Sequence, residues 1–297
     1  MRPSSVLKRG ILAMLLILLV IMSTWPFRDS LSLLFWRVRY ISTPRATGSG
    51  ARVVFPAGEP SKIGVKLAGI SEKEWRVSHV WVPSTQSLLL SSSNTIITLG
   101  CWWNHAGPIA ALPSDSAGTF SNALFRSVGL AHAPVQNQIA YQTGAAAGRH
   151  VITPPRIGPR GDGFFLVLEA EGIDANAPIR DSGQSRQSHP FFGDGDPDTI
   201  ESISVSTDGT AARVGDLAVA LFSMDPCDNP NINIDLPAGW TSLGFNNVAL
   251  LNLGYRACCK MVTEPGRQSA TCTWSDDSTF VAEATMVIFK GSGTTSE

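Results

Sequence analysis

The longest segment with the character of a buried strand is 161–173, in which 164–168 is an unbroken apolar run. Turn residues stand at both ends of this segment, and a short apolar run between turn signals is typical of a strand that is buried on both faces. Two further runs of this kind are 215–224 and 284–290. The pattern predicts that the three segments are inner strands of one β-sandwich.

The chain beyond residue 50 alternates short strand-like segments with turn signals, and no long amphipathic helix pattern appears there. Its 27 Gly and 19 Pro act as turn punctuation and do not form low-complexity blocks. We therefore predict an all-β fold, an antiparallel two-sheet sandwich of jelly-roll type, preceded by an N-terminal hydrophobic helix. The domain is expected at 51–291, followed by a disordered tail at 292–297. The alternative is two smaller sandwiches that meet near residue 200.

Residues 1–42 differ from the rest of the chain, because basic residues precede an uninterrupted apolar run at 11–22. This arrangement is typical of a signal peptide or a signal anchor. Small residues are missing where a signal peptidase would cut, which favours an uncleaved anchor that enters a membrane through residues 10–27. A cleaved signal and a segment that docks inside an assembly are the alternatives. Residues 43–50 read as a polar linker.

Charge and motif content narrow the range of functions. The net charge is −1 and charged residues make up 16% of the chain, so no electrostatic case for a nucleic-acid partner exists. The chain contains no His-x-x-x-His pair, no Gly-x-Ser-x-Gly elbow and no phosphate-binding loop with its lysine. We therefore expect a non-enzymatic protein with no obligatory cofactor.

The five cysteines include one pair that a hairpin could bring together. Residues 264–267 read Glu-Pro-Gly-Arg, a sequence that favours a type II turn. If the turn closes a two-residue hairpin, Cys259 lies opposite Cys272 and a disulfide is expected between them. Two buried thiols are the alternative, and a one-residue slip of the hairpin would separate the pair.

The densest group of carboxylates is formed by Asp194, Asp196, Asp198 and Glu201. Alternating acids on a Gly- and Pro-rich loop can direct several oxygens at one hard cation, which suits Ca²⁺. The spacing does not match an EF-hand loop, since the glycine at the sixth position is missing. The two interpretations are a calcium site and a solvated acidic loop.

Two features favour a carbohydrate ligand as the alternative function. Trp102 and Trp103, followed by Asn104, place aromatic and polar side chains at a strand end, although only one of two successive strand residues can face a ligand. Glu169 and Glu171 share one face of a strand, and a pair of carboxylates is what glycoside hydrolysis requires. The competing interpretation is one core tryptophan and two acids at an exposed strand end.

The order of turn and strand signatures resembles a β-sandwich module that is frequent in bacteriophage and prophage virion proteins. The resemblance covers roughly residues 85–291 and lies in these segments: 113–118, 138–141, 148–153, 161–169, 172–174, 215–222, 236–241, 254–258, 270–274 and 282–291. It implies a structural or adhesion protein of a tail or head, with a homo-oligomer or other structural proteins as partners. The expected location is a virion, or a membrane anchor with the C-terminal domain outside the cytoplasm.

Overall fold

The computed structural model describes the chain in nine segments, all of them within Arg45–Glu297. The predicted anchor, the linker at 43–50 and the tail beyond Ser292 lie outside the described residues. Among the described residues, no helix is long and apolar enough to cross a membrane. The segments are 64–73, 86–104, 111–127, 135–155, 161–188, 200–225, 234–248, 253–275 and 281–292.

The described residues form sixteen β-strands that pair only in antiparallel fashion, which confirms the all-β prediction. The first nine strands are β1 (Gly64–Lys73), β2 (Gln86–Leu90), β3 (Asn94–Asn104), β4 (Ser114–Asp115), β5 (Gly118–Thr119), β6 (Ser121–Ser127), β7 (Val135–Ala145), β8 (Gly148–Thr153) and β9 (Gly161–Glu171). The other seven are β10 (Ile179–Ser188), β11 (Ser202–Ser206), β12 (Leu217–Asp225), β13 (Thr241–Val248), β14 (Leu253–Met261), β15 (Ser269–Thr273) and β16 (Val281–Phe289).

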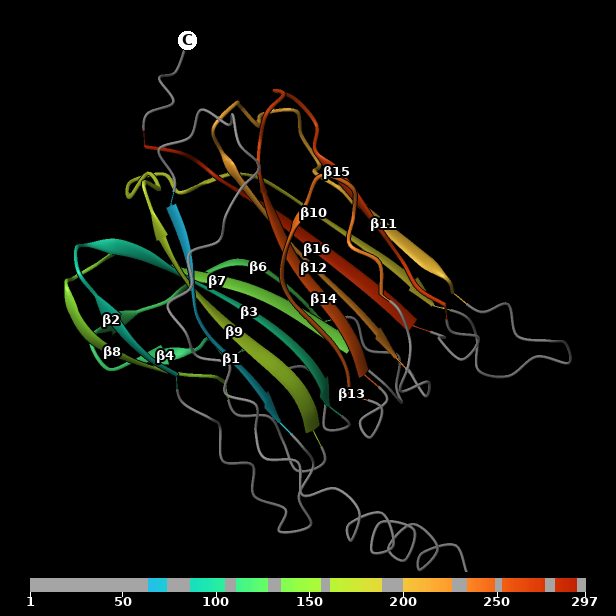
Figure 1. Ribbon diagram of the computed structural model, residues 1–297, viewed down its shortest axis with the longest axis horizontal. Helices are drawn as coiled ribbons and strands as arrows, with labels where there is room; N and C mark the ends of the chain where they lie inside the picture. The colour runs from blue at the N-terminus through green and yellow to red at the C-terminus, as the bar shows by residue number, and fades with distance from the viewer. Residues whose placement is uncertain are drawn as a thin grey trace, which may run out of the picture. The chain divides into compact units, whose positions relative to one another are not determined.

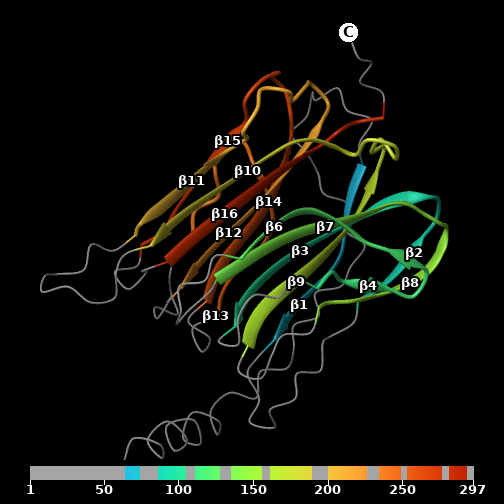
Figure 2. The ribbon, with the colours of Figure 1, turned by 180° about the vertical axis from the view of Figure 1, so that it is seen from behind.

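These strands make four sheets (Figures 1 and 2). The first inner sheet has the order β1-β9-β3-β7-β6, and the second inner sheet has the order β10-β16-β12-β14-β13. The first outer sheet is β2-β8-β4-β5, and the second outer sheet is β11-β15. The strands of the first nine therefore build one inner and one outer sheet, and the last seven build the other two.

The strands β9, β12 and β16 contribute side chains to a core on each face of their inner sheet, since successive side chains of a strand point to opposite sides. A central core lies between the two inner sheets and includes Leu166 of β9 and Leu221 of β12. Phe165, the neighbour of Leu166, lies instead in a first outer core against the first outer sheet, and Phe222 lies in a second outer core against the second outer sheet. The three apolar runs of the sequence are β9, β12 and β16, and all three belong to inner sheets, as predicted.

The two halves of the chain repeat one strand order. In each inner sheet the first strand of the half lies at one edge, beside the last strand, and the third strand follows. The connection between the halves is 172–178, between β9 and β10.

Candidate functional site

Trp102 was predicted to lie on an aromatic contact surface, but its side chain belongs to the core. Its side chain is 1% exposed and stacks on Phe165 with ring centroids 6.1 Å apart. The prediction that Trp102 binds a ligand is therefore wrong, because its position on β3 faces the first outer core. Trp103 and Asn104 complete β3, and their side chains lie outside the described residues.

The acidic cluster is only partly described. Asp194, Asp196 and Asp198 lie outside the described residues, while Glu201 is exposed and its main-chain carbonyl accepts a hydrogen bond from the Trp274 N–H (2.9 Å). Within the described segments, no three His, Cys, Asp or Glu side chains are grouped closely enough to hold a metal ion. The calcium site remains a prediction.

The predicted disulfide between Cys259 and Cys272 is not present. Gly266 does adopt the positive φ (108°) that the predicted turn requires, but β14 and β15 belong to different sheets and form no hairpin. Cys259 faces the central core, whereas Cys272 lies in the second outer core together with Cys258. Burial raises the pKa of the Cys258 thiol well above its ordinary value and that of Cys272 to about 12, so neither thiol is an activated nucleophile.

The Glu169 and Glu171 pair differs in burial. Glu169 is 4% exposed and accepts a hydrogen bond from the Asn94 side-chain amide (2.5 Å), whereas Glu171 is exposed at the end of β9. Asn94 is the first residue of β3, so this bond links two neighbouring strands of the first inner sheet. The observed contact gives Glu169 a structural role.

A buried histidine–aspartate pair lies in the first outer sheet and was not predicted. His150 Nδ1 lies 2.7 Å from the Asp115 carboxylate, and both side chains are at most 1% exposed. His150 Nε2 lies 2.8 Å from the Ala146 main-chain oxygen. Since a carboxylate and a carbonyl only accept hydrogen bonds, both ring nitrogens donate and the imidazole carries a positive charge.

This charge state decides what the pair can do. Although burial opposes it, the hydrogen bonds to Ala146 and Asp115 raise the pKa of His150 above its ordinary value of 6.5. Burial likewise opposes ionisation of Asp115, but the bonds from His150 and Ala117 lower the pKa of its carboxyl below 3.8. An imidazolium whose Nε2 already donates to Ala146 cannot act as a general base, so the pair attaches β4 to β8 and is not half of a catalytic triad.

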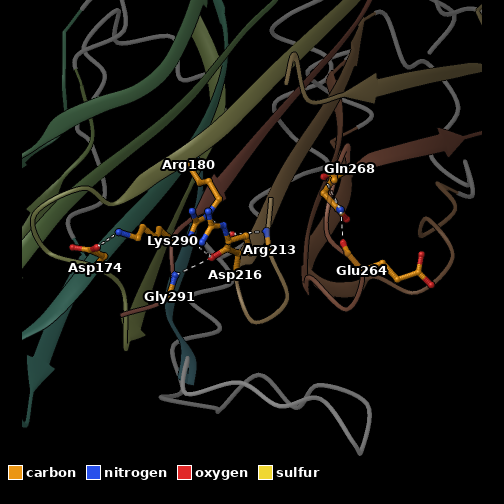
Figure 3. Close-up of polar contacts among 9 residues, drawn as sticks. Asp174, Arg180, Arg213, Asp216, Glu264, Gln268, Lys290 and Gly291 are labelled. Atoms are coloured by element: carbon orange, nitrogen blue, oxygen red, sulfur yellow. Dashed lines mark hydrogen bonds and ion pairs between the residues drawn. The ribbon is translucent and has the colours of Figure 1, made fainter. Parts of the chain in front are cut away.

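A second polar centre is Asp216, which directly precedes β12 and is fully buried (Figure 3). Its carboxylate pairs with the Arg180 guanidinium (2.5 Å) and accepts the main-chain N–H groups of Arg213 (2.9 Å) and Gly291 (3.1 Å). These donors come from β10, from the turn before β12 and from the residues after β16. One carboxylate therefore connects three segments that are distant in sequence.

The connection between the halves is attached to the end of β16 by a neighbouring ion pair. Lys290 Nζ lies 2.5 Å from the Asp174 carboxylate (Figure 3). Asp174 also accepts hydrogen bonds from the N–H groups of Asn176 and Ala177. The hydrogen bond from Lys290 contributes most to lowering the pKa of Asp174, and the bonds from the two main-chain N–H groups lower it further. Both polar centres stabilise chain connections. The only local sequence signal for Asp216 is its place in a Gly-Asp dipeptide directly before β12, and this signal does not indicate which residues pair with it.

No protein-family model, no curated protein and no solved structure matches this chain.

Proposed function

We propose that the protein is a non-enzymatic structural or adhesion component of a bacteriophage or prophage virion, in a tail or a head. The observation that carries the proposal is the strand order. The arrangement β1-β9-β3-β7 facing β2-β8-β4-β5 is what two interleaved Greek keys produce. We infer that this half is a jelly roll, a fold used by viral capsid and lectin domains.

The polar chemistry supports the same proposal. The charged centres at Asp216 and His150 tie strands and connections together, and stacked sheets fill the interior with side chains. Sheet edges such as β6 and β13 offer main-chain groups to neighbouring subunits. The partners in this proposal are further copies of the chain or other structural proteins, with the N-terminal segment docked in the assembly or inserted in a membrane.

Fractionation of particles tests the function. An antibody against residues 64–292 is used on phage particles purified from an induced culture of the source organism, beside its membrane and soluble fractions. We expect the protein to sediment with intact particles and to resist a salt wash. Its recovery only in the other fractions would contradict a virion role, and specific binding of the purified protein to a glycan array, lost in Trp103→Ala, would favour a carbohydrate-binding module.

A further inference from the structure

We propose that the described body consists of two equivalent units, β1–β9 and β10–β16, whose inner sheets bind each other through one self-complementary surface. The partner that this surface fits is a second copy of the unit, and here the copy lies in the same chain. In such an interface, a contact between positions i and j recurs as a contact between j and i.

The ladders define which positions correspond. Matching the strands in chain order pairs β1 with β10, β3 with β12, β6 with β13, β7 with β14 and β9 with β16, and every pair has the same neighbours in its sheet. Within this match, Ser121 of β6 lies opposite Tyr141, and Thr241 of β13 lies opposite Cys259. In both strands the register shifts after the second paired residue, so that Ala123 and Leu243 are each the extra residue of a β-bulge.

Both bulge residues pack on the central core, and so do other matched positions of the inner sheets. The same register also matches buried aromatic residues of the outer cores, because Phe120 directly precedes β6 and Trp240 directly precedes β13. Matched pairs that share the central core are Ile97 and Val219, Leu99 and Leu221, Ile139 and Ala257, Tyr141 and Cys259, Leu168 and Val287, and Ala170 and Phe289.

Two contacts across the central core show the reciprocal relation. Phe164 of the first unit stacks on Tyr255 of the second, with ring centroids 3.7 Å apart and planes inclined by 10°. The position that matches Tyr255 is Asn137, and the position that matches Phe164 is Glu283. The Asn137 side-chain amide donates to the Glu283 main-chain oxygen (3.3 Å), so the matched positions meet again.

The chemistry of the two contacts differs although their positions match. The aromatic pair fills the space between β9 and β14 with rings. The shorter Asn137 allows β7 to approach β16 and β12, where it also donates to the Leu221 carbonyl (3.3 Å) and accepts from the Ser223 hydroxyl (2.8 Å). The matched positions therefore meet twice, once as an apolar pair and once as a polar pair.

The test installs the aromatic pair at the second position of the full chain. Asn137→Tyr and Glu283→Phe are made singly and together, and urea unfolding is measured. Ser223 keeps a partner in these variants, because its hydroxyl also lies 3.4 Å from the Glu283 main-chain oxygen. We expect each single change to destabilise the protein. In the double variant the unfolding equilibrium constant should be at least roughly tenfold lower than independent effects would give.

The matched control combines Asn137→Tyr with Thr285→Phe, which lies two residues from Glu283 on the same strand and is equally buried. No recovery is expected there, since Thr285 matches Leu166. Additive effects in the Asn137/Glu283 pair, or equal recovery in the control, would overturn the proposal.

Cleavage of the full chain gives an independent measurement if the double variant does not fold. A protease site is inserted between Ala175 and Asn176, which are both exposed, and a control site is inserted at Ser92, in the turn between β2 and β3. After cleavage, denaturation and renaturation, the junction fragments should return as a one-to-one complex on size exclusion. The control fragments should not, because neither contains a complete first unit. Equal reassembly of both, or failure of the junction fragments, would reject two equivalent units.

Discussion

The two outer cores are packed with different residues at matching ladder positions. In the first core, Trp102 is one of the largest fully buried side chains, and in the second core the matching residue is Met224. Gly100 of the first core matches Phe222 of the second, two residues along the same strand. The aromatic side chain therefore stands at different matching positions in the two cores, at Trp102 in the first and at Phe222 in the second.

The glycine is required by the indole. A Cβ atom at Gly100 would lie 2.3 Å from Cζ2 of Trp102, a distance that the packed ring cannot accommodate. At Gly163, on the neighbouring strand, a Cβ would lie 2.4 Å from the Cys101 main-chain oxygen and 2.7 Å from Cε3 of the same ring, and the match of Gly163 in the second unit is Ala282. The two glycines and the indole therefore go together in the first core, whereas the second core combines a smaller aromatic ring with larger neighbours.

The largest expected effect tests this difference directly. Trp102→Ala removes a large, fully buried side chain of the first outer core and should lower the free energy of unfolding by about 3–5 kcal/mol. The matched change Met224→Ala should have a smaller effect, because less buried volume is lost. Urea unfolding of both variants measures the difference. A Trp102→Ala variant as stable as the unaltered chain would mean that the indole does not pack as described.

The next effect concerns the outer sheets. The first outer sheet contains the His150–Asp115 pair, whereas Cys272 of the second outer sheet donates its thiol hydrogen to the Asp235 carbonyl (3.3 Å). His150→Gln should lower stability by about 1.5–3 kcal/mol near pH 6. Because the folded pKa of His150 is raised, its contribution is complete below 6.5 and is lost as pH rises through the folded value.

Chemical unfolding across the pH range measures this effect. The Asp115 contribution behaves in the opposite sense, since its lowered pKa makes it complete above 3.8 and lost as pH falls through the folded value. The difference in unfolding free energy between the unaltered chain and His150→Gln should shrink above pH 6.5, because the contribution of the charged His150 is lost there. Arg149→Gln, an exposed change on the same strand, is the control and should show no such trend. A difference that does not change with pH would contradict a charged imidazole.

A smaller effect tests why position 100 is a glycine. Gly100→Ala should destabilise the protein by about 1–3 kcal/mol, because the added methyl group meets the Trp102 ring. In a Trp102→Met background, which reproduces the second core, the same change should have little effect. Thermal or urea unfolding of the four proteins measures the coupling. Equal effects in both backgrounds would show that the indole is not the reason for the glycine.

The smallest effect is expected outside both outer cores. Lys290→Met removes an ion pair that is partly open to solvent and should lower the free energy of unfolding by less than about 1 kcal/mol. The loss should decrease further as salt is added. Unfolding at low and high ionic strength measures it. A loss comparable to that of Trp102→Ala would assign the junction a much larger share of the stability.

The sequence predicted strands more reliably than their partners. The runs in β9, β12 and β16 were assigned to inner strands, because a strand buried on both faces must be apolar at successive positions. The prediction of a Cys259–Cys272 disulfide was wrong. Adjacent residues of a strand point to opposite sides, so Cys258 faces the second outer core, where Cys272 lies, and Cys259 faces the central core. The His150–Asp115 contact joins residues 35 apart, and no local pattern indicates it.

What the chain determined by itself is the all-β character and the two-sided burial of its inner strands, since alternation and turn residues act over a few neighbouring positions. Only the tertiary structure decided which sheet each face covers and that the two halves match. Matching positions such as Gly100 and Phe222, or Asn137 and Tyr255, share a place in the ladder but not a side chain. The equivalence therefore lies in long-range strand pairing, which a comparison of residues along the sequence does not measure.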